Sequence, residues 1–208
     1  MFTLSTLSTF IVIVIGLFLI PGPAVILIAT RTAQSGRKAG IIAGLGIATG
    51  DIIHTLFAAI GLSAILMTSS LAFNFVKIIG AVYLIYLGLR AILEKPTDLQ
   101  LPNDSQKKTS NTYSQAIFIE VLNPKTALFF LSFLPQFVHP EQGSSFLQFL
   151  ILGLIFVLLG AIYTTIVAMS IQLLSRLVKR ISWIGHWSSR IVGVIYISLG
   201  LKVAFQSR

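Results

Sequence analysis

Hydrophobic residues lie along this chain in long runs that are separated by polar connections. A helix that crosses a membrane needs roughly 20 consecutive, mostly apolar residues. The stretches that meet this requirement are residues 5–29, 40–67, 71–93, 114–137, 146–172 and 190–206. The pattern therefore predicts an all-α integral membrane protein with six transmembrane helices.

The composition agrees with a membrane protein and excludes an ordinary soluble domain. Of the 208 residues, 55% are hydrophobic and 10% are charged, whereas a soluble domain carries about 25% charged residues. So little polar surface cannot cover a globule in water. The chain has no cysteine, which excludes disulfides and thiolate metal sites.

Basic residues gather in alternate connections, and this asymmetry predicts how the helices are oriented. The first, third and fifth connections are rich in Lys and Arg, whereas the second has no charge and the fourth holds only His139 and Glu141. The odd connections are therefore predicted to be cytoplasmic, with both termini outside the cytoplasm. No basic residue precedes Arg31, so we expect the first span to remain as a membrane helix rather than to be cleaved as a signal peptide.

The net charge of +9 fits a membrane surface better than nucleic acid. The basic residues cluster between hydrophobic runs, where lipid headgroups and topology signals require them. We therefore expect membrane lipid and a small molecule as partners, and no nucleic acid.

Prolines interrupt the first and the fourth span. The residues of these broken-helix motifs are Pro21, Gly22, Pro23 and Pro124. Proline has no N–H, so the carbonyl four residues earlier loses its helical donor. The prediction is that the carbonyls of Leu17, Leu19 and Glu120 are released.

Released carbonyls inside a membrane must be satisfied by water, protein or a ligand. Two broken helices that face each other would offer carbonyls to a cation and amides to a carboxylate. A zwitterionic amino acid needs both. The alternative is a pair of kinks that serve only the shape of the helices.

The third and sixth spans share a pattern that indicates an internal repeat. GAVYLIYLGLR at 80–90 and GVIYISLGLK at 193–202 both carry Gly, Tyr and Leu-Gly-Leu before a basic residue. Each half also begins with a proline-broken helix, and three helices per half make the second half enter from the opposite side. This predicts two inverted three-helix repeats, as in many secondary transporters. Chance similarity between apolar helices is the alternative.

The repeat divides the chain into three parts. Residues 1–93 form the first three-helix repeat, 94–113 a polar cytoplasmic linker, and 114–208 the second repeat.

Asp51 and Glu120 are the only acidic residues within the predicted spans, and Lys125 is the one deep base. Such residues are costly in hydrocarbon unless they face a cavity or a partner. His54 follows Asp51 by three residues and therefore shares its helix face. We assign substrate binding or proton coupling to Asp51, His54, Glu120, Asn123 and Lys125.

Structural roles for these residues remain open at this point. The Asp51 carboxyl suits a proton carrier or a partner for a substrate ammonium group, but it could also only hydrogen-bond neighbouring helices. Glu120 and Lys125 could form an internal ion pair if Pro124 bends the helix between them.

Glycines recur at a spacing of four in the second span. The residues are Gly40, Gly44, Gly46 and Gly50. Small residues at this spacing let helix backbones approach closely. The packing can occur within one chain or between two, so a homodimer stays open.

Three stretches in order, PGPAVILIATRTAQSGRKAGIIAGLGIATGD, GAVYLIYLGLRAIL and NPKTALFFLSFLPQF, resemble the LysE/RhtB family of bacterial amino-acid exporters. The resemblance covers essentially the whole chain. It implies an inner-membrane protein that exports amino acids or close derivatives, driven by the proton motive force. It also implies that the Pro-Gly-Pro motif, Gly50-Asp51 and Asn123-Pro124-Lys125 form the functional core. No residue here selects one amino acid.

Other functions remain as alternatives. A passive channel for small polar solutes would show a polar stripe through several spans, whereas these spans offer isolated polar residues. An enzyme is not expected, because His54, His139 and His186 have no metal-ligand spacing, and no metal or cofactor is predicted. A non-transporting membrane assembly partner is not excluded.

Overall fold

The computed structural model describes residues 2–20, 22–68 and 111–178, with single positions inside 75–93 and 194–201. Pro21, most of the linker and most of the third and sixth predicted spans lie outside the described residues. The part of the chain that is described is helical and contains no strand.

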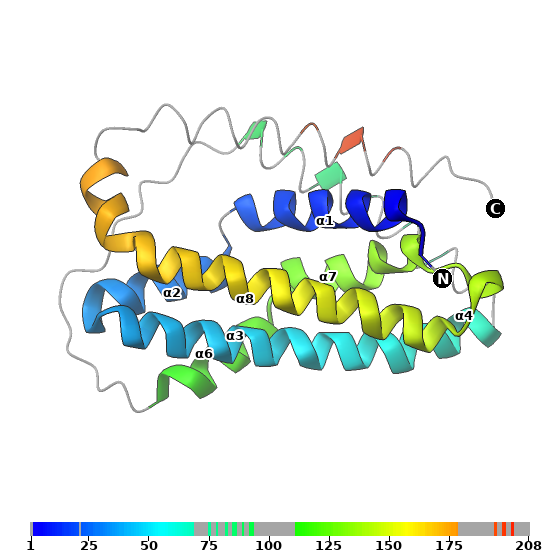
Figure 1. Ribbon diagram of the computed structural model, residues 1–208, viewed down its shortest axis with the longest axis horizontal. Helices are drawn as coiled ribbons and strands as arrows, with labels where there is room; N and C mark the ends of the chain where they lie inside the picture. Colours follow the sequence, from blue (N-terminus) through cyan, green and yellow to red (C-terminus); the bar gives the residue numbers. More distant parts are fainter. Residues whose placement is uncertain are drawn as a thin grey trace.

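Long helices run along the greatest dimension of the molecule (Figure 1). The elements are α1 (Leu4–Leu19), α2 (Pro23–Ser35), α3 (Arg37–Phe57), η1 (Ala58–Leu62), α4 (Ser63–Thr68), α6 (Thr112–Val121), α7 (Pro124–Ser132), η3 (Leu134–Phe137), η4 (Pro140–Gln142) and α8 (Ser145–Val178). Helices α3 and α8 are antiparallel neighbours, and the pairs α1–α2 and α6–α7 pack beside them (Figure 1).

Two continuous helices are long and apolar enough to cross a membrane, Arg37–Ile65 and Ser145–Ser170. Two further spans arise if each bent pair, α1–α2 and α6–α7, counts as one. The described residues thus provide two to four spans, which match the first, second, fourth and fifth predicted stretches. The full count of six stays a prediction.

The first span breaks at the Pro-Gly-Pro motif. Helix α1 ends at Leu19, and Ile20 and Gly22 have extended backbone. Pro23 takes the first position of α2, where its missing N–H removes no helical hydrogen bond. The two helices meet at an angle of 57°.

The fourth span breaks at Asn123-Pro124. Helix α6 ends at Val121, and Asn123 has the extended backbone of an N-cap (φ −72°, ψ 108°). Its side-chain oxygen accepts the Lys125 N–H, while Pro124 fills the first position of α7. The bend here is 46°.

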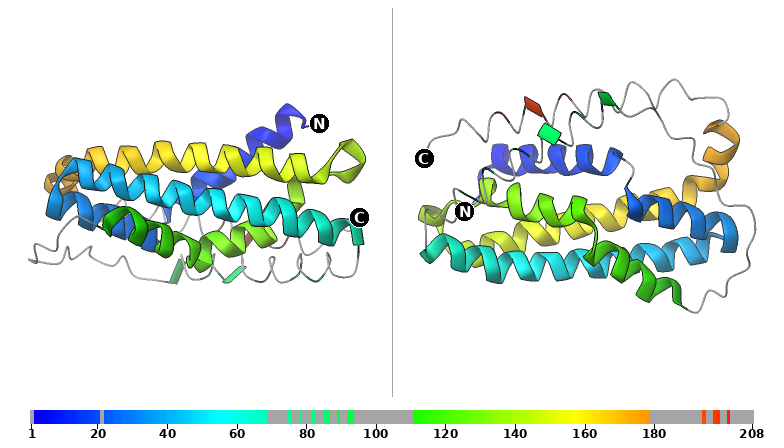
Figure 2. Two further views of the ribbon diagram at one scale, coloured as in Figure 1. Left: turned by 90° about the horizontal axis from the view of Figure 1, so that it is seen from below. Right: turned by 180° about the vertical axis from the view of Figure 1, so that it is seen from behind.

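The two broken pairs run in opposite directions through the molecule (Figures 1 and 2). As a result, the carboxyl end of α1 meets the amino end of α7 near the middle of the bundle, where Lys125 Nζ reaches Leu17 O. An inverted repeat requires such opposed directions. Because the third helix of each half lies outside the described residues, the repeat itself stays a prediction.

A single residue, Gly36, connects α2 to α3. Its φ of 82° lies in the left-handed region, which glycine adopts without strain. The helices therefore extend beyond the apolar runs, so that Arg31 lies in α2 and Arg37 and Lys38 begin α3. The observed first connection is therefore shorter than the one between the predicted spans, which covered residues 30–39.

Glycines on one face of α3 let α6 approach closely. A Cβ atom at Gly46 would lie 2.5 Å from the carbonyl oxygen of Tyr113, and one at Gly50 would lie 2.6 Å from Cβ of Glu120. Neither position has room for a larger residue unless α3 and α6 separate. This contact sets the position of Glu120 along the axis of α3, next to Gly50.

The other two glycines of α3 face different neighbours. A Cβ at Gly40 would collide with Oγ1 of Thr32 in α2, and one at Gly44 would lie 3.1 Å from Oγ1 of Thr164 in α8. All four glycines thus make their close contacts within one chain, and a homodimer is not needed to account for them.

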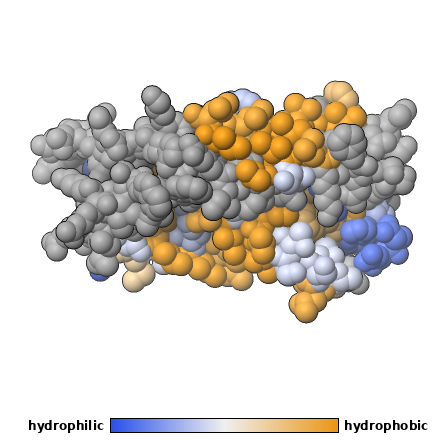
Figure 3. Space-filling model, turned by 90° about the horizontal axis from the view of Figure 1, so that it is seen from above, coloured by the Kyte–Doolittle hydropathy of each residue, from blue (hydrophilic) through white to orange (hydrophobic). Residues whose placement is uncertain are grey.

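Aromatic rings fill the space between α1, α7 and α8. Phe10, Phe129, Phe133 and Phe156 are buried, with exposed fractions of 3% or less. Phe129 stacks on Phe133 and on Phe156, with ring centroids 5.1 and 5.0 Å apart. Outside this core, hydrophobic side chains make up most of the described surface on the face that Figure 3 shows, as expected of a lipid-facing surface.

We predict that Gly46→Ala lowers the thermal unfolding midpoint of the protein in detergent. The added methyl group meets a main-chain carbonyl that cannot move alone, and overpacking of this kind costs about 1–3 kcal/mol. The control is Gly61→Ala in η1, where no described atom lies within 4 Å of the added carbon. Equal midpoints for the two variants would contradict the close contact of α3 with α6.

Candidate functional site

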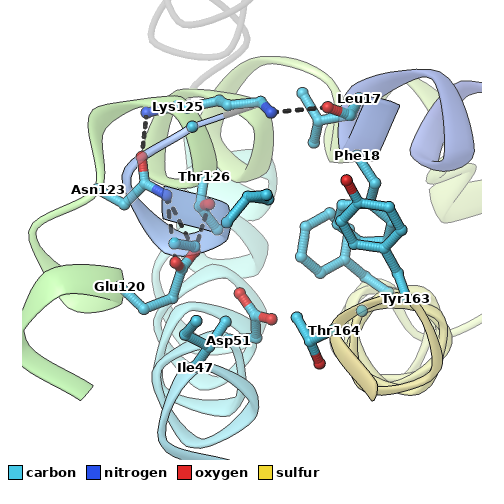
Figure 4. Close-up of a pocket in the computed structure, with 15 residues that line it drawn as sticks. Leu17, Phe18, Ile47, Asp51, Glu120, Asn123, Lys125, Thr126, Tyr163 and Thr164 are labelled. Carbon is cyan, nitrogen blue, oxygen red and sulfur yellow. Dashed lines mark hydrogen bonds between the residues drawn. The ribbon is translucent and has the colours of Figure 1, made fainter. Parts of the chain in front are cut away.

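A pocket lies where the two helix breaks meet, and residues of six helices line it (Figure 4). Its polar side chains are Asp51, Glu120, Asn123, Lys125, Thr126, Tyr163 and Thr164. Four of the five residues that the sequence assigned to substrate or proton thus line one pocket. Gly22 of the Pro-Gly-Pro motif also borders it.

The Glu120 side chain is held by the first turn of α7. Thr126 Oγ1 donates to Oε1 at 2.5 Å, and Asn123 Nδ2 lies 3.3 and 3.2 Å from the two carboxyl oxygens. Glu120 is only 2% exposed. Asn123 therefore does two things at once, because its oxygen caps α7 and its nitrogen orients the carboxyl group.

His54 lies behind the pocket rather than in its wall. Its Nε2 is 3.0 Å from the main-chain oxygen of Glu120, the carbonyl that Pro124 releases. A carbonyl only accepts, so Nε2 carries a proton and donates. The Asn123 N–H donates to the same oxygen at 3.0 Å, and the ring stacks on Phe130. His54 thus stabilises the second break.

Lys125 reaches from α7 to the end of α1. Its Nζ donates to the Leu17 carbonyl at 2.7 Å (Figure 4). It also donates to the Ile20 carbonyl at 2.5 Å. Leu17 is one of the carbonyls that the sequence predicts to be released, whereas Ile20 takes the place of Leu19. Carbonyls at this break are therefore bound by the protein's own ammonium group.

These hydrogen bonds answer whether Glu120 and Lys125 pair directly. The Glu120 carboxyl is bound by Asn123 and Thr126, whereas the Lys125 ammonium is bound by carbonyls of α1. Each charged group thus has its own hydrogen-bond partners.

Asp51 enters the pocket from α3. Its carboxyl borders Gly160 of α8, where a Cβ atom would lie 3.3 Å from Oδ2. Asp51 and Glu120 both line the pocket, and Figure 4 shows their carboxyl groups facing the same space. Thr55 Oγ1 donates to the Asp51 main-chain oxygen at 2.8 Å, and the Thr55 side chain is buried against Gly153 of α8. The pocket therefore holds two carboxyl groups and one ammonium group.

One wall of the pocket is aromatic, and the sequence analysis missed it. Phe18 stacks on Tyr163 with centroids 5.4 Å apart and an interplanar angle of 13°, and it also packs on Phe156. Tyr163 and Thr164 form a polar interruption in a long apolar run, and that interruption was the available signal. Thr126, directly after the proline motif, was a similar signal.

The open volume of the pocket is small, about 40 Å³. A single ordered water needs roughly 10–15 Å³ of such space, so the pocket has room for a few waters but not for an amino acid. A larger ligand requires the surrounding helices to move apart. Within the described ranges, no group of three or more metal-ligating residues occurs.

Comparisons with known proteins give a consistent result. The family model described as LysE type translocator matches residues 15–207. The membrane protein YrhP of Bacillus subtilis (strain 168) is 30% identical over 208 residues, 96% of this chain and 98% of that protein. Leucine efflux proteins of Klebsiella pneumoniae and of an Enterobacter strain are each 25% identical, and each alignment covers 94% of this chain and 93% of that protein. No solved structure gives a significant match.

We predict a strong interaction between substitutions at Asn123 and Glu120. Asn123→Asp keeps the cap of α7 but replaces the donor to Glu120 by a second carboxylate, so the thermal midpoint in detergent should fall. In Glu120→Gln/Asn123→Asp the new amide donates to the new carboxylate, and the midpoint should recover. These two variants, Glu120→Gln and the wild type form a double-mutant cycle. If the changes in midpoint of the two single variants add up to that of the double variant, the two side chains are not coupled.

Proposed function

The chain belongs to the LysE type translocator family, and from this premise we propose that it exports amino acids across the bacterial inner membrane. The family resemblance that its motifs indicated is confirmed by this match. Relatives that align along nearly the whole chain are named leucine efflux proteins. A neutral amino acid with an apolar side chain is therefore the first substrate to test.

The observation that carries the proposal is a pocket with groups for both charges of an amino acid. Asp51 offers a carboxyl group to a substrate ammonium. Among the described residues, no side chain caps the amino end of α2, whose first-turn residues Ala24 and Val25 line the pocket. The N–H groups of a first turn have no helical acceptor and favour an anion such as a carboxylate.

The aromatic wall suits the side chain of an apolar amino acid. Phe18 and Phe156 have apolar side chains, and the ring of Tyr163, which stacks on Phe18, extends the same wall. Leu17 and Ile47 complete the apolar part of the lining. These groups gain from contact with a branched aliphatic chain and offer no partner to a second charge.

We further propose that Asp51 couples export to protons. Two carboxyl groups and one ammonium group give the pocket an excess of negative charge when both acids are ionised, and like charges repel strongly away from water. Either a proton or a substrate ammonium at Asp51 relieves this repulsion. Alternating occupation of Asp51 by the two would exchange an outgoing amino acid for an incoming proton, driven by the proton motive force.

The transport cycle we propose is alternating access. The two broken helices run in opposite directions and meet at the pocket, as in transporters whose inverted repeats rock about a central site. Six spans in two inverted repeats, both termini outside the cytoplasm and a location in the inner membrane belong to this proposal. A homodimer stays a prediction on which the pocket does not depend, because one chain supplies all its lining residues.

Counterflow in proteoliposomes tests the proposed function. Vesicles preloaded with unlabelled leucine should accumulate labelled leucine transiently, and the rate should saturate. A pH gradient should then drive uphill movement. A passive channel would equilibrate the label without overshoot. Failure of every amino acid on a broad panel to move would overturn the proposal.

We predict that Asp51→Asn abolishes pH-gradient-driven accumulation but leaves the protein folded. The amide still hydrogen-bonds an ammonium group but cannot carry the proton, so exchange should survive in part. Glu141→Gln, an exposed position outside the pocket, is the matched control and should transport normally. Normal uphill export by Asp51→Asn would remove Asp51 from the coupling mechanism.

A further inference from the structure

The Lys125 ammonium binds the same type of group, carbonyls at a helix break, that holds a metal cation in other transporters with broken helices. In such proteins the unwound carbonyls and carboxyl ends of half-helices coordinate Na⁺. Here the carboxyl end of α1 offers the carbonyls of Leu17 and Ile20, and both accept from the Lys125 ammonium, at 2.7 and 2.5 Å. We propose that the Lys125 ammonium is a built-in cation that replaces a bound Na⁺ and joins the two broken helices.

The electrostatics of the two helix ends favour this assignment. Lys125 is the second residue of α7, whose amino end carries partial positive charge and does not favour a lysine. The carboxyl end of α1 carries partial negative charge and favours a cation. The side chain therefore gains its electrostatic stabilisation from the other broken helix, in the manner of a bound ion.

The surroundings of the side chain also match a fixed cation. The stem crosses Gly22, whose position would place a Cβ atom 3.4 Å from Cδ and 3.8 Å from Nζ. Behind it, the Asn123 side-chain oxygen accepts from the Lys125 main-chain N–H, and its nitrogen donates to the Glu120 carboxyl group. The Lys125 side chain thus links the two breaks, because its main chain is bonded at the second break and its ammonium at the first.

This position has a consequence for transport. The pocket does not hold an amino acid while the broken helices are in contact, because its open volume is about 40 Å³. Separation of α7 from the end of α1 requires the ammonium to leave the two carbonyls. Lys125 is therefore a positioning residue that holds the closed pocket together, and the protein needs no Na⁺ for this purpose.

The test removes the built-in cation and supplies it again from solution. Lys125→Ala deletes a three-carbon chain with its ammonium, which propylammonium matches in size and charge. Propan-1-ol has the same length without the charge. Lys125→Met keeps most of the stem volume and loses the ammonium, with both its charge and its hydrogen-bond donors. Lys38→Ala, at an exposed lysine in the first turn of α3, is the control.

The readouts are the thermal midpoint in detergent and the initial rate of leucine counterflow. Hydrogen bonds to a charged group are worth roughly a factor of ten or more in an equilibrium constant. Alternating access passes through the closed pocket that Lys125 holds together, so Lys125→Ala should lose at least about that factor in counterflow rate and should unfold at a temperature several degrees lower. Propylammonium should restore both in Lys125→Ala, and propan-1-ol should not. Lys125→Met should be slow and insensitive to propylammonium, because its side chain fills the space.

Sodium dependence gives the second arm of the test. The wild-type protein should transport equally in sodium chloride and in choline chloride at one ionic strength. A requirement for Na⁺ in the wild-type protein would overturn the proposal, as would wild-type rates in Lys125→Met. If propan-1-ol restored the midpoint and rate of Lys125→Ala as well as propylammonium does, Lys125 would have only a packing role and the proposal would be overturned. If Lys125→Ala does not fold, the counterflow rate of Lys125→Met and the sodium comparison still test the proposal.

The transport readout rests on the proposed function, whereas the midpoint readout does not. Rescue of the Lys125→Ala midpoint by propylammonium, with no amino acid transported by the wild type, would support the built-in cation and refute the exporter. Saturable leucine counterflow by the wild type, with Lys125→Met equally active, would support the exporter and refute the built-in cation.

Discussion

Main-chain carbonyls that lose their helical donors inside a membrane need new donors, and the centre of this protein is organised around that constraint. Pro124 releases the Glu120 carbonyl, which is bound by His54 and by the Asn123 N–H. At the other break the carbonyls of Leu17 and Ile20 are bound by the Lys125 ammonium. Each break is thus completed by a side chain from a distant segment, and the two breaks are drawn together.

The pocket is a consequence of these bonds. Because Lys125 holds the end of α1 against the start of α7, the Glu120 carboxyl, the uncapped end of α2 and Asp51 face one space. Groups that would be unfavourable in lipid become partners for each other, which is how ionisable residues persist within spans. The same arrangement keeps the pocket small, so an amino acid can enter only when the broken helices separate.

The glycines of α3 make this arrangement possible at the level of packing. Gly50 lets the stem of Glu120 lie directly on α3, one residue before Asp51, and Gly46 lets the preceding turn of α6 do the same. A helix with larger residues there would hold α6 farther away, and the two carboxyl groups would not share a pocket. Close backbone contact, rather than hydrophobic burial, sets the geometry, as is common among helices in lipid.

The sequence by itself determined the helical membrane class, the positions of both breaks and the small set of ionisable residues that needed partners. Local chemistry suffices for these, since hydrophobic runs, missing proline N–H groups and charges in apolar segments are properties of neighbouring residues. Only the tertiary structure decided that Lys125 binds carbonyls 108 and 105 residues away, that His54 supports the break, and that Phe18 and Tyr163 form a wall. Those contacts depend on how bent helices pack, and no periodicity in one chain encodes that.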